Sequence, residues 1–403
     1  MKIITGGVTA ATGFQAAGIH CGVKNNEKKD LALIISECVC NAAATYTTNQ
    51  VKASPLYVTK AHLENDQAKA IICNSGNANA CAPKGEENAE RMCRMISNIT
   101  GIAENDIVVA STGVIGQELN IQAIEKGAPD LVKLLNEQGS DAAAEAIMTT
   151  DLLKKEVAVE FEIGGKEIKM GAIAKGSGMI HPNMGTMLCF ITTDASIDSE
   201  ILKTALKEAV KKTFNRVSVD GDTSTNDMCC ILANGLARNQ EIKEKGKDYD
   251  VFLQNLQYIC EYLAKMIAKD GEGATKLITC DVQGAKNEED AELCAKSVAS
   301  SSLLKSAMFG CDANWGRVLC AMGYSGAEFS PEEVAVAFSS GAGIISVCQK
   351  GKGLTFDEKE AKKILSEKEI TIEINMNQGN SSARAWGCDL SYEYVRINGD
   401  YRS

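Results

Sequence analysis

The chain has 403 residues, of which 45% are apolar and 24% are charged, and its formal net charge is −11. This length suits two lobes or one large α/β unit, and the composition is that of a soluble globular protein. The acidic balance argues against nucleic acid or an anionic membrane surface as a partner. No apolar run reaches the roughly 18 residues of a membrane span and the first residues break too early for a signal peptide, so we expect a cytoplasmic protein.

The cysteines and histidines form no familiar metal-ligand pattern. None of the 16 cysteines belongs to a Cys-x-x-Cys pair, and the only histidines are His20, His62 and His181. We therefore expect no metal site, and buried, reduced thiols that act as small hydrophobic groups. With three histidines there are few candidates for a histidine-based catalytic triad, which favours a catalytic base of another kind.

Short apolar runs predict three strands in the first part of the chain, at residues 31–35, 70–73 and 105–110. The second run leads into the Asn/Gly-rich residues 74–80, which fit either a turn followed by a helix cap or a loop that lines a site. The third leads into the small residues 111–116, which fit either a simple strand-to-helix turn or a loop that exposes backbone N–H groups.

A hairpin is predicted next, because apolar and polar residues alternate on both sides of Gly164-Gly165. Its second strand leads to Lys175 and to the segment 175–188. This segment has three glycines and a proline within eleven residues, so it cannot be a helix or a central strand. The apolar run 187–191 that follows predicts a buried strand.

The segment 175–188 is either a surface connector or a site of chain scission at Gly185-Thr186. A glycine offers an unshielded carbonyl, and the threonine hydroxyl after it could attack that carbonyl. The cut would leave Thr186 as a new N-terminus, whose α-amine has an ordinary pKa of about 7.7 to 8.0, close to the value that suits a general base. The nucleophile and its base would then belong to one residue.

Two helices and two strands are predicted in the second half. A helix begins near Asp198 or Ser199, and another covers residues 251–269 and ends at Asp270-Gly271. Strands are predicted at residues 277–279 and 370–376. Members of the apolar face of the first helix are Ile201, Leu202, Ala205, Leu206, Ala209, Val210 and Phe214.

The acidic run 220–227 invites comparison with a calcium-binding loop. Its sixth position is Thr225 where such a loop needs glycine, and its twelfth is Ile231 where it needs glutamate. We therefore interpret this run as a metal-free polar loop near the site.

Together, residues 175–180, 182–184 and 186–188 resemble the self-cleavage segment of the bacterial ornithine acetyltransferase family, whose members are bifunctional glutamate N-acetyltransferases and amino-acid acetyltransferases. The chain is similar to this family from Gly7 to Ser403. It differs at Gly185 and Gly399, where the family usually has alanine.

The resemblance implies a layered αββα sandwich similar to the N-terminal-nucleophile hydrolases, of the DmpA/ornithine acetyltransferase type, with a C-terminal α/β lobe. Scission would give an α chain of residues 1–185 and a β chain of residues 186–403. Residues 186–275 would complete the sandwich, and residues 276–403 would form the lobe. The family assembles from two α and two β chains, and we expect the same heterotetramer.

The function implied is a step of arginine biosynthesis, the transfer of an acetyl group from N2-acetylornithine to glutamate through an acetyl-threonine intermediate. By this resemblance Thr186 is the nucleophile, and Thr112 and Gly113 form the oxyanion hole. No cofactor is expected, although acetyl-CoA could serve as a substrate. Implied contacts with the substrate come from Thr150, Lys175, Thr186, Glu272, Asn398 and Ser403, and Thr149 could take the place of Thr150.

Two alternatives stay open at this point. A self-cleaving amidase or aminopeptidase of the same fold would share the nucleophile but would let water accept the acyl group. An uncleaved, inactive member could act as a binding protein, and Gly185 makes this conceivable.

Overall fold

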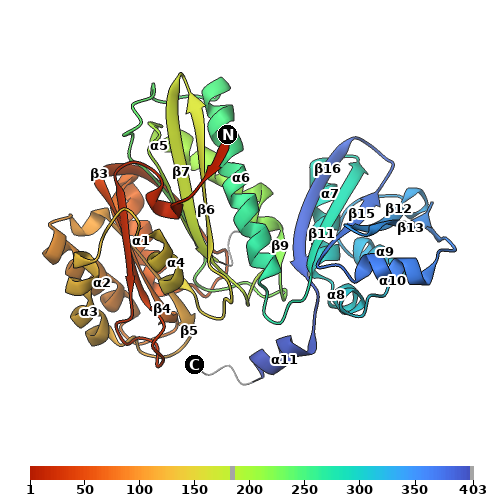
Figure 1. Cartoon of the computed structure of the whole chain (residues 1–403), viewed down its shortest axis with the longest axis horizontal. Helices are drawn as coiled ribbons and strands as arrows, with labels where there is room; N and C mark the ends of the chain where they lie inside the picture. The colour runs from red at the N-terminus through yellow and green to blue at the C-terminus, as the bar shows by residue number, and fades with distance from the viewer. Residues whose placement is uncertain (182–186, 400–403) are drawn as a thin grey trace.

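The computed structural model describes residues 1–181 and 187–399, which form a sandwich of helices and sheet layers and a smaller lobe (Figure 1). Helix α6 (Lys247–Lys269) lies between these two parts (Figure 1). It packs its apolar face on the sandwich, and Trp386 and Cys388 of the lobe join the same hydrophobic cluster. The two parts therefore share buried surface.

Within the described residues the sandwich has one nine-stranded sheet, in the order β1-β6-β7-β8-β10-β3-β4-β5, with β2 paired to β3. Neighbouring strands are antiparallel except for the parallel pairs β4–β5 and β8–β10. The strands are β1 (Lys2–Ile4), β2 (Phe14–Ile19), β3 (Leu31–Tyr46), β4 (Gln67–Asn77), β5 (Ile107–Val114), β6 (Lys155–Ile163), β7 (Lys166–Lys175), β8 (Leu188–Thr193) and β10 (Met228–Ala233).

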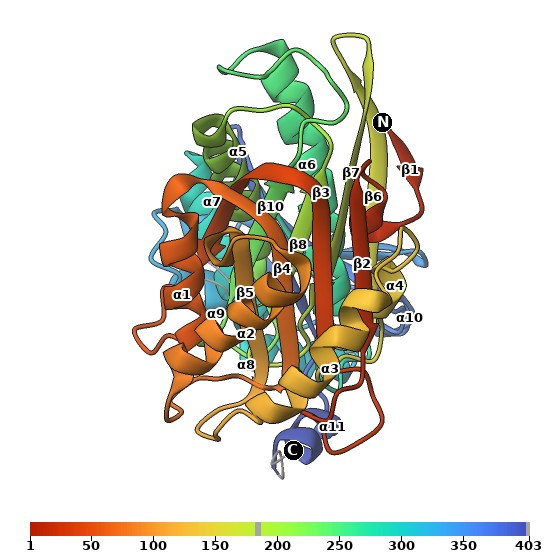
Figure 2. The same cartoon turned by 90° about the vertical axis from the view of Figure 1, so that its left-hand side faces the viewer.

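Strand β3 belongs to both layers of the sandwich. Its first half pairs with β2, from Leu31 to Ser36, and its second half pairs with β10, from Asn41 to Tyr46. The sheet therefore folds over along β3, so that β2, β4 and β5 face β6, β7, β8 and β10 across a shared core. Figure 2 looks through the helices of one side onto β2 to β5, with the second layer behind them.

The sandwich has four layers, two of sheet and two of helices, because successive side chains along each strand point to opposite faces. In β4, Ile71 and Cys73 point into the core between the sheet layers, while Ala70 and Ile72 belong to the cluster under the outer helices. In β8, Leu188 belongs to the inner core, whereas Ile191 faces α5 and α6. Each layer of the sheet thus has two apolar faces and requires a cover on its outer side.

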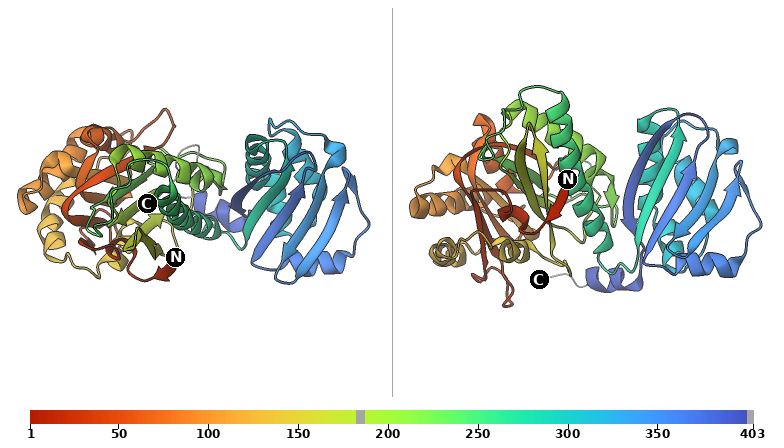
Figure 3. Two further views of the ribbon diagram at one scale, coloured as in Figure 1. Left: turned by 90° about the horizontal axis from the view of Figure 1, so that it is seen from above. Right: turned by 45° about the horizontal axis from the view of Figure 1, so that its top comes forward.

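Helices cover both outer faces and one end of the sandwich (Figure 3). On one side are α1 (Ser54–His62), α2 (Gly85–Thr100) and α3 (Ile121–Lys133), on the other α5 (Ser199–Lys212) and α6, while α4 (Ser140–Ile147) closes the inner core. The αββα prediction is thus confirmed, with one difference. The two layers are a single sheet, because β3 is long enough to serve both.

The lobe has a second sheet with the order β14-β13-β12-β15-β11-β16-β9, with helices packed against it. Strand β9, at one edge of this sheet, is the first of its strands in the sequence. It comes from within the sandwich part of the chain and pairs with β16. The strands are β9 (Val217–Ser218), β11 (Leu277–Ala285), β12 (Ala335–Ser340), β13 (Gly343–Gln349), β14 (Lys352–Gly353), β15 (Glu369–Asn375) and β16 (Ser381–Cys388). The helices are α7 (Glu288–Ser300), α8 (Ser302–Phe309), α9 (Trp315–Gly323) and α10 (Glu358–Leu365), and the short α11 (Tyr392–Asn398) follows the sheet.

Local signals predicted several elements well. The Gly164-Gly165 hairpin is confirmed, and both glycines have positive φ, 57° and 75°, as a two-residue turn of this type requires. Helix α5 begins after Asp198, whose carboxylate accepts hydrogen bonds from the backbone N–H groups of Glu200 and Ile201. Phe214, predicted on the same helix, instead follows it in a 3₁₀ turn.

Three predicted strands are longer than the sequence indicated. The run 31–35 extends to Tyr46, the Asn/Gly-rich residues 74–77 continue β4, and residues 111–114 continue β5. The interpretations of residues 74–77 and 111–114 as turns or loops were therefore wrong. Polar side chains there are compatible with a strand because other segments supply hydrogen-bond partners, as described below.

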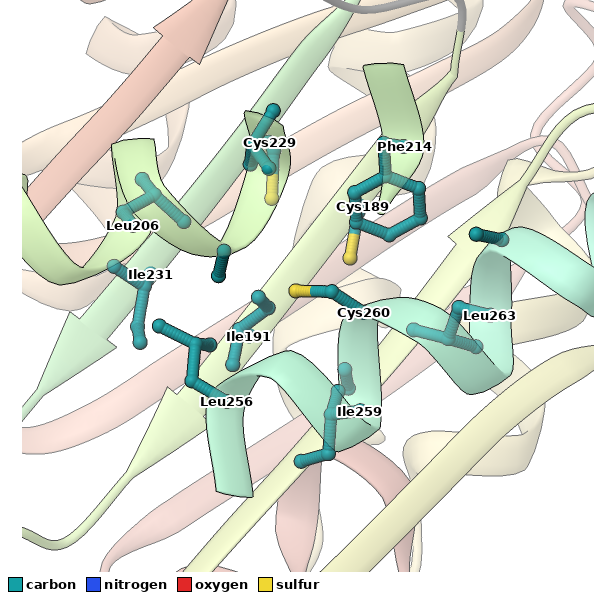
Figure 4. Packing of buried hydrophobic residues seen from close by; sticks show 14 of the residues in the cluster. Cys189, Ile191, Leu206, Phe214, Cys229, Ile231, Leu256, Ile259, Cys260 and Leu263 are labelled. Carbon is teal, nitrogen blue, oxygen red and sulfur yellow. The ribbon is translucent and has the colours of Figure 1, made fainter. Parts of the chain in front are cut away.

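The thiols lie largely in hydrophobic cores. Figure 4 shows Cys189, Cys229 and Cys260 packed between β8, β10 and α6, among neighbours such as Leu256. Burial raises the pKa of Cys189 and Cys260 above the ordinary thiol value, which keeps both protonated. The prediction of buried thiols fails at Cys81 and Cys320, which are exposed.

Candidate active site

The oxyanion-hole candidates lie side by side at the end of β5. Thr112 pairs with Ser75 of β4, and Gly113 pairs with Gly76. Gly113 has a φ of 135°, and a Cβ atom there would lie 2.3 Å from the carbonyl carbon of Gly76. Only glycine fits this close approach of two backbones.

A polar network fixes the ends of β4 and β5. The Ser111 hydroxyl donates to Asn74 Oδ1 at 2.6 Å. The Asn226 side chain donates to the backbone oxygens of Ser111 at 2.8 Å and Ala78 at 2.6 Å. Through Asn226, the predicted polar loop 220–227 holds the strand ends that carry Thr112 and Gly113.

The same loop holds the segment that follows Lys175. The Asp220 carboxylate accepts hydrogen bonds from the backbone N–H of Met179 at 2.6 Å and of Ile180 at 2.8 Å. The Thr223 hydroxyl donates to the His181 carbonyl oxygen at 2.9 Å. Lys175 itself is the last residue of β7 and is 8% exposed. Gly185 and Thr186, the predicted scission site, lie outside the described residues.

Glu272 and Asn398 meet beside this segment. The Asn398 side-chain N–H donates to Glu272 Oε2 at 2.7 Å, and the Glu272 backbone N–H donates to the Ser177 carbonyl oxygen at 2.9 Å. A Cβ atom on Gly178 would lie 2.4 Å from the Glu272 carboxyl group, so a glycine leaves the room that this carboxylate occupies. Ser403 lies outside the described residues.

A cavity of about 390 Å³ opens next to these groups. Burial and the carboxylates of Asp220, Asp222 and Glu272 raise the pKa of Tyr394, which keeps this phenol neutral. Burial also raises the pKa of Asp220. Asp220 and Asp222 give this cavity an acidic wall, which suits a positively charged ligand group. The lining residues are Asn49, Val51, Ile115, Met179, Asp220, Asp222, Thr223, Thr225, Tyr394 and Asn398.

A second cavity, of about 500 Å³, is lined in part by Thr149 and Thr150. Lys24 at its wall donates to the backbone oxygens of Met148 at 2.7 Å and Lys29 at 2.8 Å. Burial lowers the pKa of Lys24 to about 8. The lining residues are Gly22, Val23, Lys24, Asn25, Asn26, Lys28, Gly76, Asn77, Gln117, Glu118, Asn120, Thr149 and Thr150.

Both cavities adjoin the strand ends that carry Thr112 and Gly113. Gly76 and Asn77, which pair with this stretch of β5, line the larger cavity, and Ile115 just beyond it lines the smaller one. The structure thus brings Glu272 and Asn398 together in direct contact. It places Thr149 and Thr150 at the larger cavity.

Sequence reasoning missed two residues of this site. Asp220 was only part of a polar loop, although it anchors two consecutive backbone N–H groups. Tyr394 gave no signal, because a tyrosine near a chain end is usually a surface residue.

No group of three or more His, Cys, Asp or Glu side chains suited to a metal is found among residues 1–181 and 187–399. In the same residues, no helix has the length and apolar character needed to cross a membrane.

Comparisons with known proteins agree on one family. The sequence model of the ArgJ family matches residues 15–403. The arginine biosynthesis bifunctional protein ArgJ 1 of Clostridium acetobutylicum is 50% identical over 397 residues, which cover 98% of this chain and 97% of the relative. The corresponding ArgJ protein of Caldanaerobacter subterraneus subsp. tengcongensis is 48% identical over the full length of both chains.

A solved structure agrees with these relatives. The crystal structure of the arginine biosynthesis bifunctional protein ArgJ from Bacillus halodurans is 48% identical, with a TM-score of 0.51. The match covers 53% of this chain and 99% of that chain. Because the family model and the relatives match nearly the whole chain, the chain belongs to the ArgJ family.

Proposed function

We propose that this protein is an acetyltransferase of arginine biosynthesis, which moves the acetyl group of N2-acetylornithine to glutamate and releases ornithine and N-acetylglutamate. The names of its full-length relatives support the pathway. The observation that carries the proposal is the meeting of Glu272 and Asn398 beside the segment that follows Lys175, next to the strand ends that carry Thr112 and Gly113.

The proposed chemistry is a double displacement on Thr186. Its hydroxyl attacks the acetyl carbonyl while its own α-amine takes the hydroxyl proton. The C–N bond of acetylornithine then breaks, and the proton passes to the leaving amine of ornithine. The amine of glutamate attacks the resulting threonine ester, which restores the hydroxyl and forms N-acetylglutamate. Acetyl-CoA is an alternative donor in the first half of this sequence, and no cofactor is required.

Thr112 and Gly113 would stabilise the negative charge that develops on the carbonyl oxygen in both halves. Preorganised donors act best in a site that excludes water, and Thr112 is only 7% exposed. Loss of one such donor lowers kcat by about 10² to 10³-fold.

The charges of the site suit an amino acid with a second amine. The Lys175 ammonium would pair with the substrate carboxylate, with Thr150 as a further contact. The carboxylates of Asp220 and Asp222 in the wall of the smaller cavity, with Glu272 beside Asn398, would attract the side-chain ammonium of ornithine. Asn398 and Ser403 would close the site.

The reaction requires scission at Gly185-Thr186 into chains 1–185 and 186–403, which would assemble as an α2β2 heterotetramer in the cytoplasm. The β chain would be just over half of the sequence. This agrees in length with the solved relative, 99% of which corresponds to 53% of this chain.

Three measurements test the proposal. The intact mass of the purified protein should show two chains, and that of Thr186→Ala one. Ornithine release from N2-acetylornithine should depend on glutamate, whereas release without glutamate would indicate an amidase or aminopeptidase. A single uncleaved chain without turnover would indicate an inactive binding protein. Formation of N-acetylglutamate from acetyl-CoA and glutamate would identify the bifunctional type.

A further inference from the structure

A buried charge cluster adjoins the segment that follows Lys175. The Lys155 ammonium donates to Asp151 Oδ1 at 2.7 Å and to Asp270 Oδ2 at 2.5 Å. The side chains of Lys155 and Asp151 are fully buried, and that of Asp270 is 3% exposed. Lys155 is the first residue of β6, and Asp270 directly follows α6, 115 positions later in the sequence.

Every carboxylate of this cluster is also bound to backbone N–H groups. Asp151 accepts from Gly176 at 2.7 Å and from Thr149 at 3.0 Å. Asp270 accepts from Leu152 at 3.1 Å and Leu153 at 3.2 Å. A buried cluster of charges adds little net stability compared with apolar packing, but it is costly to break. Its presence therefore calls for a role other than holding the fold together.

These hydrogen bonds connect the segments of three proposed substrate contacts. The Thr149 and Gly176 N–H groups that Asp151 binds are adjacent to Thr150 and Lys175. The Asp270 carbonyl oxygen accepts from the Ser177 hydroxyl at 2.7 Å, and Ser177 in turn binds the backbone of Glu272. The cluster also joins residues on both sides of the proposed scission site.

Lys175 is a further cation near Asp151; Lys24 is also attracted to this carboxylate, but its ammonium donates to the carbonyl oxygens of Lys29 and Met148. Burial opposes the ionisation of Asp151, but the ammonium groups of Lys155 and Lys175 outweigh it and hold the pKa of this carboxyl below its ordinary range. Asp151 is thus charged and attracts both lysines. The direct hydrogen bond goes to Lys155.

We propose that Lys155 is a positioning residue of the acetyltransferase: by occupying Asp151 and Asp270, it leaves the Lys175 ammonium free for the substrate carboxylate and fixes Lys175 relative to Glu272. This inference rests on the proposed function. Without Lys155, Asp151 would take Lys175 as its replacement partner and withdraw it from the substrate. Removal of the Asp151 charge in addition would release Lys175 again.

The test compares Lys155→Met with the double variant Lys155→Met/Asp151→Asn, using initial rates with N2-acetylornithine and glutamate. We expect Lys155→Met to raise KM for acetylornithine at least tenfold and to change kcat less than about threefold. The double variant should recover most of the lost affinity, although it removes more of the cluster. A merely structural role predicts the opposite order, because each further loss would add to the damage.

Arg216→Met is the matched control. Arg216 is also a buried cation that bridges two carboxylates, with 2.9 Å contacts to Glu288 and Glu292, but no proposed substrate contact adjoins it. Its loss should lower the melting temperature and leave KM unchanged. If Lys155→Met does not fold, Lys155→Gln keeps donors for both carboxylates without the charge and should raise KM in the same way.

The outcomes separate the two proposals. An active wild type whose KM is unaltered in the Lys155 variant, or a double variant weaker than the single one, would refute the role of Lys155 alone. A wild type that does not turn over acetylornithine would refute the proposed function and this inference with it.

Discussion

Asn398 donates a hydrogen bond of 2.7 Å to the carboxylate of Glu272, which lies 126 positions earlier in the sequence. This contact joins the C-terminal helix α11 to the loop that follows α6. Ser391, just before α11, strengthens the connection with a hydrogen bond from its hydroxyl to the Gly273 carbonyl oxygen at 2.5 Å. The last helix is thereby held at the acidic wall of the smaller cavity.

Asn398→Ala should raise KM for N2-acetylornithine about tenfold, which corresponds to about 1.4 kcal/mol of binding free energy. The reason is that Glu272 loses the donor that orients its carboxylate. Steady-state kinetics measures the change. Asn377→Ala is the control, because the Asn377 side chain also donates a hydrogen bond, of 2.8 Å, but to the neutral Glu333 carbonyl oxygen in the lobe. Equal KM values for both variants would contradict the role of Asn398.

The roles of Thr149 and Thr150 can be distinguished by replacing each threonine with valine, which has nearly the same shape but no hydroxyl group. Thr150→Val should raise KM about two- to tenfold through the loss of one hydrogen bond of ordinary strength. Thr149→Val is the matched control at the same cavity and should leave KM unchanged. The reverse order of KM values would assign the substrate contact to Thr149.

Asp151 should make stability depend on pH in the acid range. Its pKa lies below the ordinary value of about 3.9, so the stabilisation from its charge is complete above that pH and is lost as the pH falls below it. Urea unfolding of the wild type and of Asp151→Asn should therefore show a difference in unfolding free energy that is constant above about pH 5 and shrinks below pH 4. A difference that grows towards acid pH would contradict this assignment.

The thiols should differ in their reactivity. Iodoacetamide added to the native protein should modify the exposed Cys81 and Cys320 and spare Cys189 and Cys260, which are buried and protonated. Peptide mass spectrometry before and after denaturation measures this. Rapid modification of Cys260 in the native state would show that the core in Figure 4 opens readily.

Elements that depend on neighbouring residues were predictable. The hairpin at Gly164-Gly165 follows from a two-residue period and a turn that needs glycine, and helix α5 follows from its cap and its apolar face. The motif around Lys175 likewise pointed to the family, because it is a continuous stretch of sequence.

Features that depend on distant partners were not predictable. Asn74 and Ser111 lie within strands because they bind each other and because Asn226 binds the Ser111 carbonyl oxygen, and no local pattern reveals such contacts. Asp270 was predicted only as the end of a helix, although its carboxylate accepts a hydrogen bond from Lys155 of strand β6. Polar residues whose partners come from elsewhere in the fold remain ambiguous in a single sequence.

The sheet order β7-β8-β10-β3 has a consequence for the cleaved protein. Scission at Gly185-Thr186 would leave two β-chain strands hydrogen-bonded between two α-chain strands, so the chains could separate only by melting the sandwich. Unfolding would release two separate chains that must associate again to refold, so the melting temperature of the cleaved protein would rise with its concentration. The uncleaved Thr186→Ala chain would melt at a temperature independent of dilution if it behaves as a monomer.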